Sequence, residues 1–424
     1  MKAERLILIS AGAIGLAAIL TAADWPQWRG PRRDAISSEA GLLEEWPAKG
    51  PALLWQNKDI GDGYSTPAVA GNRIYLLSNR GLDNEFVQAL SVQDGKVLWT
   101  TTLGKVGNPG QQPNFPCARS TPTLDGDAIY VLSSDGDLAS LDAATGKARW
   151  RKSLRSDFRG QPHPWAYAES PLIDGDALIV TPGGAEATLV ALNKRTGETI
   201  WKSAVPGGDV AGYSSAIVVE AAGRKQYVQF LAKGLVGVDA RTGQFLWRYE
   251  GAPTGSYQAS TPIASKEYVY VAAGGNAGGG LVRLAAAAGG VTEDQVYFRP
   301  GLPNGSGGAV LLKGILYGAN NRGLVAADFM TGKPLWQAAQ EEGVGPASIM
   351  YADGRLYLHG FNNDVALVEA SPVGYRERGR FTPPEPPKHV RGQTERSWPH
   401  PVVANGRLYI RDLESLWCYD IRGK

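Results

Sequence analysis

The stretch Leu141-Asp142-Ala143-Ala144-Thr145-Gly146-Lys147-Ala148-Arg149-Trp150 decides the fold of this chain because it recurs. Residues Val238 to Trp247 repeat it as Val-Asp-Ala-Arg-Thr-Gly-Gln-Phe-Leu-Trp. In each copy an aspartate ends a strand-like run, a Thr-Gly pair supplies a tight turn, and a tryptophan closes the next strand. Glycine suits that turn because it adopts positive φ at little cost. Comparable turns centre on Gly95, Gly197 and Gly332.

A second segment opens each repeat unit and occurs eight times, with its copies about 40 to 55 residues apart. The copies are GYSTPAVA from Gly63, ARSTPTLD from Ala118, YAESPLID from Tyr167, GYSSAIVV from Gly212, QASTPIAS from Gln258, GSGGAVLL from Gly305, GPASIMYA from Gly345 and SWPHPVVA from Ser397. With the turns described above, a complete unit holds four antiparallel strands. This period and strand count predict an all-β, eight-bladed β-propeller.

The two ends of the chain complete one blade. The last unit, from Ser397 onward, has three strands, whereas Leu53-Leu54-Trp55 is a closing strand with no unit before it. A ring closed by pairing these fragments has no open sheet edge. We therefore expect a single propeller domain over residues 53–424, closed by an N-terminal strand that completes the C-terminal blade. Residues 24–52 then form an N-terminal strap.

Large aromatic residues close the fourth strand of seven units: Trp99, Trp150, Trp201, Trp247, Phe298, Trp336 and Phe381. Recurrence at one point of a repeat indicates packing between neighbouring blades and not ligand binding. Trp25, Trp28 and Trp46 stand outside the repeat. We expect these three to pin the strap onto the ring.

Composition and charge agree with this fold and exclude one class of partner. The chain has 54 glycines, 27 prolines and only 20% charged residues, as expected for short strands joined by turns. Its formal net charge is +2 without a basic run, so no nucleic acid partner is expected. Cys117 and Cys418 fall in different repeats and are expected to be buried free thiols, with a disulfide as the alternative.

Residues 1–23 have the order of a secretory signal peptide. Lys2 and Arg5 precede an apolar run from Leu6 to Leu20, and small residues at 21–23 suit a signal peptidase. The run is too short for a comfortable membrane span. We expect a periplasmic or secreted protein with no membrane span after leader removal; an uncleaved anchor is the alternative.

The repeated Leu-Asp or Val-Asp, Thr-Gly-Lys and Trp pattern resembles the pyrroloquinoline-quinone (PQQ) repeat. That repeat occurs in quinoprotein alcohol dehydrogenases and in the propeller subunit of the outer-membrane β-barrel assembly machinery. The opening Asp24-Trp25-Pro26-Gln27-Trp28-Arg29-Gly30-Pro31 is similar to the start of exported bacterial proteins described as quinone-binding-like propellers. The resemblance covers nearly the whole mature chain, and it implies a fold without dictating chemistry.

The chain departs from the dehydrogenase pattern. That pattern includes adjacent cysteines over the quinone, a calcium ion with carboxylate and amide ligands, and an aspartate base. Here Cys117 stands alone, and Glu169 is the one acidic residue before the fifth position of any opening segment. Calcium takes about six or more oxygen ligands. We therefore predict no cofactor and no metal, with PQQ and calcium as the alternative.

The residues just before each innermost strand are expected to surround the central funnel. They give the candidate ligand-binding residues Tyr64, Arg119, Glu169, Tyr213, Gln258, Asn304 and His400. Arg119 and Glu169 come from adjacent blades, so an interblade salt bridge is the alternative to ligand binding. The histidines form no metal-ligand or Ser-His-Asp pattern, and no catalytic residue is assigned.

These observations favour an exported binding or scaffold protein. Its funnel mouth or loop faces would meet a protein, a peptide or a polysaccharide. A PQQ-dependent, alcohol dehydrogenase-like oxidoreductase with an altered cofactor site is the first alternative, and an enzyme that uses polar funnel residues on another substrate is the second.

Overall fold

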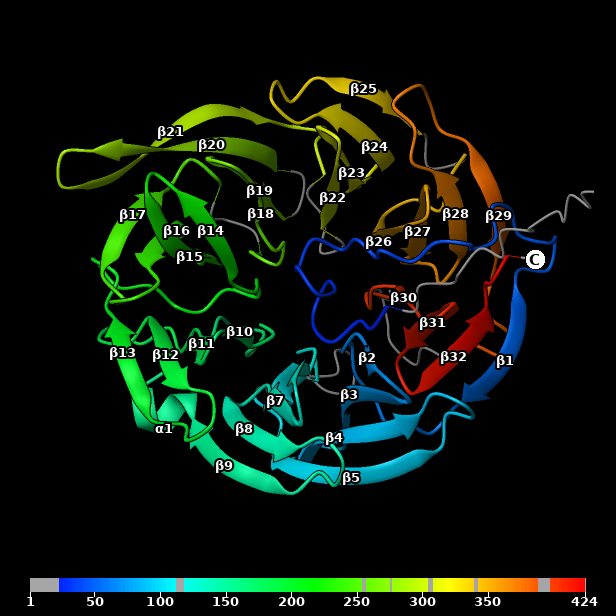
Figure 1. Cartoon of the computed structure of the whole chain (residues 1–424), viewed down its shortest axis with the longest axis horizontal. Helices are drawn as coiled ribbons and strands as arrows, with labels where there is room; N and C mark the ends of the chain where they lie inside the picture. The colour runs from blue at the N-terminus through cyan, green and yellow to red at the C-terminus, as the bar shows by residue number, and fades with distance from the viewer. Residues whose placement is uncertain are drawn as a thin grey trace, which may run out of the picture.

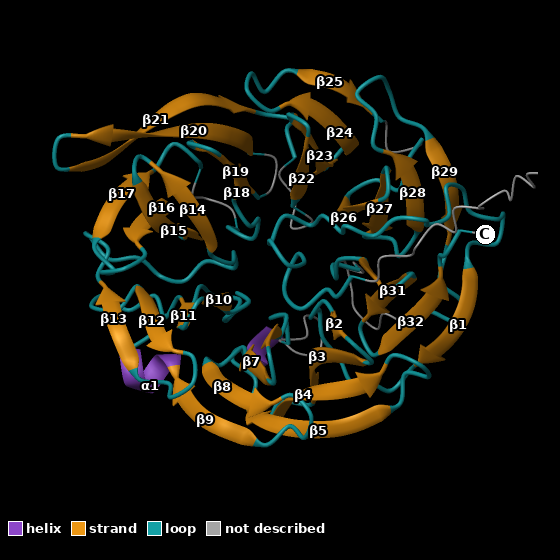
Figure 2. Ribbon diagram, viewed as in Figure 1, coloured by secondary structure: helices purple, strands orange, loops and turns teal. Residues whose placement is uncertain are grey.

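The computed structural model describes residues 23–111, 118–253, 257–274, 277–303, 308–338, 342–387 and 397–423. The described strands form eight four-stranded sheets, set as blades around a ring (Figure 1). The predicted eight-bladed, all-β propeller is confirmed. Figure 2 shows strands around the whole ring and very little helix, which consists of α1 (Leu154–Phe158) and the 3-10 turn η1 (Pro109–Gln111) in the described residues.

In each of the first seven blades the strands follow chain order from the centre outward. Blades 1 and 2 comprise β2 (Ala68–Ala70), β3 (Arg73–Arg80), β4 (Asn84–Ser91), β5 (Val97–Gly104), and β6 (Thr123–Asp125), β7 (Ala128–Leu132), β8 (Asp137–Asp142), β9 (Ala148–Ser153). Blades 3 and 4 comprise β10 (Leu172–Asp174), β11 (Ala177–Val180), β12 (Leu189–Asn193), β13 (Thr199–Ser203), and β14 (Ile217–Ala221), β15 (Arg224–Leu231), β16 (Gly234–Asp239), β17 (Phe245–Tyr249).

The remaining blades repeat the arrangement. Blades 5 and 6 comprise β18 (Ile263–Ser265), β19 (Tyr268–Ala273), β20 (Gly278–Ala287), β21 (Gly290–Arg299), and β22 (Ala309–Leu312), β23 (Ile315–Asn320), β24 (Gly323–Asp328), β25 (Pro334–Gln337). Blades 7 and 8 comprise β26 (Ala347–Ala352), β27 (Arg355–Gly360), β28 (Val365–Glu369), β29 (Glu377–Phe381), and β30 (Val402–Ala404), β31 (Arg407–Asp412), β32 (Ser415–Asp420), β1 (Ala52–Asn57).

The ring is closed by the N-terminal strand, as predicted. β1 pairs antiparallel with β32, with Leu53 opposite Tyr419 and Trp55 opposite Cys418, and the strand order of this blade is β1-β32-β31-β30. Figure 1 shows the blue β1 beside the red β32. Closure by hydrogen bonding removes the sheet edge that an unpaired β32 would expose.

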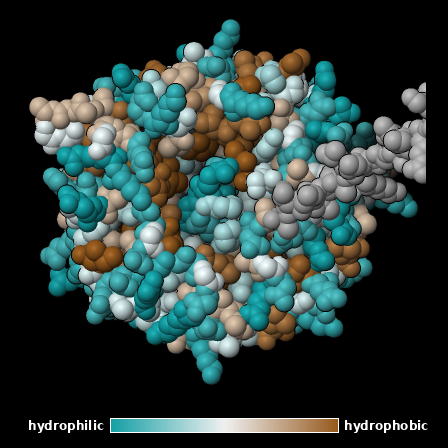
Figure 3. Space-filling view, viewed as in Figure 1, coloured by the Kyte–Doolittle hydropathy of each residue, from teal (hydrophilic) through white to brown (hydrophobic). Residues whose placement is uncertain are grey.

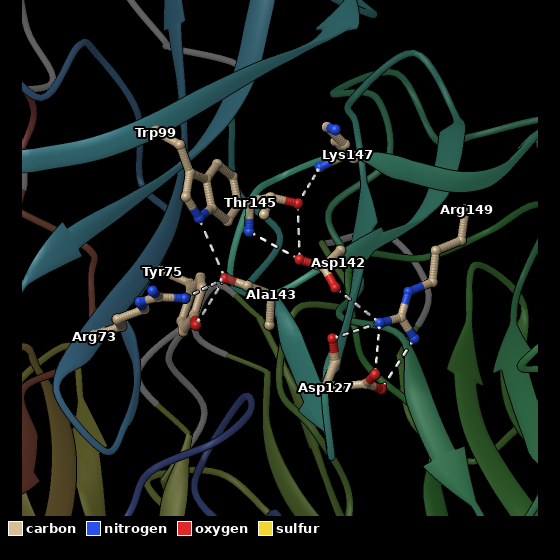
Figure 4. A network of polar contacts seen from close by, with 9 residues as sticks. All are labelled: Arg73, Tyr75, Trp99, Asp127, Asp142, Ala143, Thr145, Lys147 and Arg149. Carbon is tan, nitrogen blue, oxygen red and sulfur yellow. Dashed lines mark hydrogen bonds and ion pairs between the residues drawn. The ribbon is translucent and has the colours of Figure 1, made fainter.

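The quoted repeat forms a turn that accepts the tryptophan of the preceding blade (Figure 4). Asp142 Oδ1 accepts hydrogen bonds from the Thr145 backbone N–H and hydroxyl at 2.9 and 2.7 Å. Gly146 has a φ of +72°, and a Cβ there would lie 2.5 Å from the Trp99 ring. Trp99 Nε1 donates to the Ala143 carbonyl at 3.2 Å. These contacts support the packing interpretation of the repeat tryptophans.

Two of the aromatic assignments were wrong because a β-bulge in each blade sets the register. The repeat tryptophan lies opposite the residue just before the bulge, as Trp99 lies opposite Ala89. In blade 5 that position is held by Tyr297 and not by Phe298. The Tyr297 hydroxyl donates to the Phe329 carbonyl of blade 6 at 2.8 Å.

In blade 7 the corresponding position is Gly379, not Phe381, and the strap supplies the missing ring. A Cβ on Gly379 would lie 2.5 Å from the Cβ of Trp46. The Trp46 ring packs on Tyr357 at a centroid distance of 5.9 Å, much as Trp99 packs on Tyr75 at 6.0 Å. Trp46 of the strap therefore occupies, in blade 7, the place that the repeat tryptophan of the fourth strand occupies in other blades.

Some sequence predictions fall outside the described residues. These include leader residues 1–22, Cys117 and Asn304. Cys418 is a buried free cysteine, and burial raises the pKa of its thiol to about 12. Among the described residues, no helix is both long enough and apolar enough to cross a membrane.

Candidate functional site

The strap enters the centre of the ring, where Figure 1 shows it as a blue coil between the blades. Trp25 and Val69 exchange two backbone hydrogen bonds, at 2.7 and 2.8 Å. Farther along, the Ala35 carbonyl accepts from Tyr351 N–H at 2.8 Å, and Ile36 bridges the same residue of blade 7. The strap therefore spans the channel from blade 1 to blade 7.

Two arginines fix the strap inside the channel. Arg33 donates to the carbonyls of Ala216 at 2.9 Å, of Ser170 at 3.0 Å, and of Pro171. Arg29 donates to the carbonyl of Ala309 on the opposite side. Both guanidinium groups are buried, and burial lowers the pKa of Arg33 to about 9 and that of Arg29 to about 10. Charged donors satisfy carbonyls at or just before the start of inner strands, on the side of the axis where there is no partner strand.

Trp28 stands at the end of a cavity of about 290 Å³. Its Nε1 donates to Thr261 Oγ1 at 2.8 Å, and its ring meets His400 edge-on at a centroid distance of 4.6 Å. Half of the described lining is aromatic; the lining residues are Trp28, Tyr64, Thr66, Arg119, Trp165, Ala168, Ser170, Tyr213, Ser215, Tyr257, Ala259, Phe361, Trp398 and His400. Figure 3 shows hydrophilic side chains in the middle of the ring with hydrophobic ones around them.

The alternation of side chains along an extended segment explains which predicted residues reach this cavity. The second and fourth residues of the opening segments face the axis, as Tyr64 with Thr66 and Tyr213 with Ser215 show. By the same rule Arg119, a second residue, and His400, a fourth residue, lie in the lining. The sequence reasoning missed Trp28, Trp165, Tyr257, Phe361 and Trp398. Of these, Trp398 shares the second position with Tyr64.

Glu169 does not face the funnel, contrary to the sequence prediction. As the third residue of its segment it turns between the blades, where it accepts from the Thr181 hydroxyl at 2.7 Å and from Gln229 Nε2 at 3.2 Å. Burial raises the pKa of this carboxyl to about 7. The proposed ion pair of Glu169 with Arg119 is therefore also wrong, since the partners of Glu169 are Thr181 and Gln229.

Gln258, the first residue of its segment, is likewise fully buried and outside the lining. Its backbone carbonyl accepts from Tyr213 N–H at 2.9 Å, which joins blades 4 and 5 at the mouth. Asn304 cannot be placed because it lies outside the described residues.

The loop that carries Trp165 ties three blades together at the mouth. Arg119 of blade 2 donates to the Trp165 carbonyl, and Trp165 N–H donates to the Tyr213 hydroxyl at 3.1 Å. His163 Nδ1 lies 2.5 Å from the same hydroxyl. Burial raises the pKa of Tyr213 to about 12, so the phenol is neutral at ordinary pH. The loop is thus held as part of the funnel wall.

The donor set does not fit a calcium-bound quinone. No carboxylate lines the described part of the cavity, and the described residues contain no group of three or more histidine, cysteine, aspartate or glutamate side chains suited to a metal. A carboxylate-bearing cofactor buried without a metal needs several positive groups. Arg119 is the single permanent charge among the described lining residues.

The sequence matches a protein-family model that is described as outer membrane protein assembly factor BamB. The matched residues are 32–162 and 83–338. The chain is 24% identical to a tetrathionate hydrolase of Acidithiobacillus ferrooxidans, over 53% of this chain and 48% of that protein. It is 24% identical to the BamB of Shewanella oneidensis, over 56% of this chain and 55% of that protein. The matches thus span about half the length of these curated relatives.

A solved structure with the same fold is the quinohemoprotein alcohol dehydrogenase of Comamonas testosteroni. It aligns with a TM-score of 0.62 at 14% identity, over 95% of this chain and 81% of the enzyme chain. Similarity at this level of identity concerns the fold alone, and function has to be argued from the cavity.

Proposed function

The chain belongs to the BamB-like family of PQQ-repeat propellers, and from that premise we propose that it is an exported binding protein whose funnel takes a segment of a protein partner. The observation that carries the proposal is the aromatic cavity above Trp28. Concave sites rich in aromatic side chains, with few polar groups, are typical of binding pockets for apolar groups. The BamB relatives, named as assembly factors, support a protein partner.

The polar groups of the cavity favour a peptide over a polysaccharide. Three hydroxyls in the lining already accept backbone hydrogen bonds from a neighbouring blade or segment. Thr66 Oγ1 accepts from His400 N–H at 3.1 Å, Ser215 Oγ from Ser170 N–H at 2.9 Å, and Ser170 Oγ from Thr121 N–H at 2.9 Å. A sugar chain presents many hydroxyls that need partners, whereas an apolar side chain needs mainly contact area.

The positions of the described cavity residues do not support the oxidoreductase alternative. Dehydrogenation of an alcohol needs a base within hydrogen-bond reach of the substrate. Glu169, the one acidic residue before the fifth position of any opening segment, is turned between the blades and accepts from the Thr181 hydroxyl. The proposal therefore assigns no catalytic residue and no cofactor.

Photo-crosslinking in the native host tests the proposed function. Tyr257 lies at the cavity and is 42% exposed, and Val296 on the outermost strand of the same blade is 43% exposed. A photoreactive phenylalanine analogue at Tyr257 is expected to give a discrete protein adduct, and the same analogue at Val296 is the matched control. The proposal fails if Tyr257 gives no protein adduct, or gives only what Val296 gives.

We also propose that the protein works in the periplasm or outside the cell, after removal of residues 1–23. The charged, apolar and small-residue order of that segment supports export. Mass spectrometry of the protein from its native host is expected to find an amino terminus near Asp24. An intact Met1 in the membrane fraction would contradict the proposed export.

A further inference from the structure

The funnel is blind, because the strap fills the channel beyond Trp28. Trp25, Arg29 and Arg33 are all buried, and a Cβ on Gly30 would already lie 2.8 Å from the Trp25 ring. The guanidinium groups are bound to carbonyls on both sides of the channel. A chain that entered the mouth would have to stop at Trp28, so the cavity suits the end of a ligand and not its middle.

Among its described lining residues, the cavity has one permanently charged side chain, and that charge is positive. Arg119 lines it, and the described lining holds no aspartate, glutamate or lysine. Arg119 acts electrostatically on the buried Glu85, whose carboxylate accepts two hydrogen bonds from Ser134 N–H, at 3.0 and 3.1 Å. Burial raises the pKa of Glu85 to about 7, which reduces its negative charge near neutral pH. A single negative group on the ligand matches this electrostatic pattern.

The walls favour a large apolar group next to that negative charge. The Tyr64 and Trp398 rings pack at a centroid distance of 4.8 Å, and Trp28 packs against His400 at 4.6 Å, which gives flat surfaces fixed by their neighbours. Aromatic side chains bind apolar and aromatic groups through contact area and ring geometry. The amino end of a peptide would carry the wrong charge for Arg119.

We propose that the cavity binds the carboxyl-terminal end of a peptide, with a terminal aromatic or large aliphatic side chain resting on Trp28 and the α-carboxylate beside Arg119. This inference rests on the proposed function and names the part of the partner that enters the funnel. Charge-assisted hydrogen bonds from arginine to a carboxylate are among the stronger polar contacts in proteins. They favour a free carboxylate over its neutral amide by about tenfold or more.

Calorimetric titration of the purified protein with short peptides tests the inference. The probes are Ala-Ala-Phe with a free carboxylate, the same peptide as its carboxyl-terminal amide, and Ala-Ala-Ala with a free carboxylate. The free acid of Ala-Ala-Phe is expected to bind at least about tenfold more tightly than either of the other two. Trp28→Ala is expected to weaken binding of both phenylalanine peptides.

Arginine variants separate charge recognition from folding of the mouth. Arg119→Gln is expected to lower the affinity for the free-acid peptide to that for the amide peptide. Arg119→Lys keeps the positive charge and is expected to keep most of the preference for the free acid. Arg151→Gln is the matched control, because Arg151 of the same blade also donates to backbone carbonyls, those of Leu103 and Thr102, away from the cavity. It is expected to leave all three affinities unchanged.

Three outcomes would overturn the inference. They are equal affinity of acid and amide, an acid preference that survives Arg119→Gln, and no binding of any peptide up to about 1 mM. Tighter binding of an oligogalacturonate than of every peptide would replace the peptide by an acidic polysaccharide. If crosslinking at Tyr257 succeeds while acid and amide bind equally, the proposed function stands and this inference alone falls.

Discussion

Replacing Arg33 with methionine is expected to destabilise the protein, because the variant leaves the buried carbonyls of Ala216 and Ser170 without their donor, whereas the Pro171 carbonyl keeps the Thr123 hydroxyl at 2.6 Å. Each buried acceptor that loses its partner costs about 1 to 3 kcal/mol. Methionine keeps most of the side-chain stem in place, so the loss of packing is small. The lost hydrogen bonds are therefore the main destabilising contribution.

A second contribution acts in the opposite direction. Burial of the guanidinium group lowers the pKa of Arg33 to about 9, which means that the fold disfavours its charge. Removing the charge recovers part of that desolvation cost. The net loss is expected to be about 3 kcal/mol in the free energy of unfolding. With an unfolding entropy of about 2 cal/mol/K per residue, a ring of this size would melt about 4 °C lower.

Arg32 provides the matched control, because its side chain is 67% exposed and pairs with Asp34 at 2.9 Å on the surface. Arg32→Met is expected to change the melting temperature by less than about 1 °C. Differential scanning calorimetry, with limited proteolysis of the strap as a second measurement, distinguishes the two variants. If Arg33→Met has the same melting temperature as Arg32→Met, and its strap resists proteolysis equally well, the role given to Arg33 is refuted.

Three further predictions concern the buried carboxyl, the displaced tryptophan and ring closure. Because burial raises the pKa of Glu169 to about 7 from 4.5, stability from this group is full below about pH 4.5 and is lost as the pH rises through 7. Glu169→Gln should therefore lose less stability than the parent between pH 5 and 8, by up to about 3 kcal/mol in urea unfolding; equal losses would contradict this. Trp46→Ala should cost about 3 to 5 kcal/mol, and Gly379→Ala should be similarly harmful because of the clash with Trp46. Gly71→Ala, at a φ of +56° with nothing within 4 Å of a new Cβ, shows the cost of a positive-φ alanine without a clash. Gly379→Ala should stay harmful when Trp46 is alanine, because the clash is with the Cβ of residue 46, and should cost less when residue 46 is glycine. Deleting residues 24–56 should expose the edge of β32 and cause aggregation in size-exclusion chromatography, and a monomer that melts like the parent would refute that.

The fold was readable from the sequence because its determinants are local and repeated. Asp142, Thr145 and Gly146 form their turn within one short segment, and Trp99 packs on that turn from the preceding unit. The ring closure followed from counting strands. The assignments at Phe298 and Phe381 failed because the residue that meets the next blade depends on a β-bulge, and a bulge leaves no mark in the spacing of aromatic residues.

The candidate site was only partly readable. Tyr64, Arg119, Tyr213 and His400 lie in the lining, whereas Glu169 and Gln258 occupy odd positions of their segments and turn away. A stricter use of the two-residue alternation would have separated these groups. The strap could not be placed, because no repeat specifies its partners.

The backbone of the strap gives a further reason. Arg29, Arg33 and Ala35 adopt φ values of +60°, +58° and +61°, which sequence patterns do not predict for residues other than glycine. Trp28, the end wall of the cavity, depends on that path. Its role became visible only with the contacts to Thr261 and His400.

The strap and the closing strand also set the order in which the molecule can be completed. Leu43, near the beginning of the chain, donates its backbone N–H to the carbonyl of Ile421 near the end, and β1 pairs with β32. A ribosome makes these early residues first, yet their docking sites do not all exist until the last blade has been synthesised. Contacts over such long separations in sequence slow folding. Leu43 and the residues of β1 must therefore stay unpaired until the last blade exists, and assembly of the ring finishes with residues that were synthesised near the start.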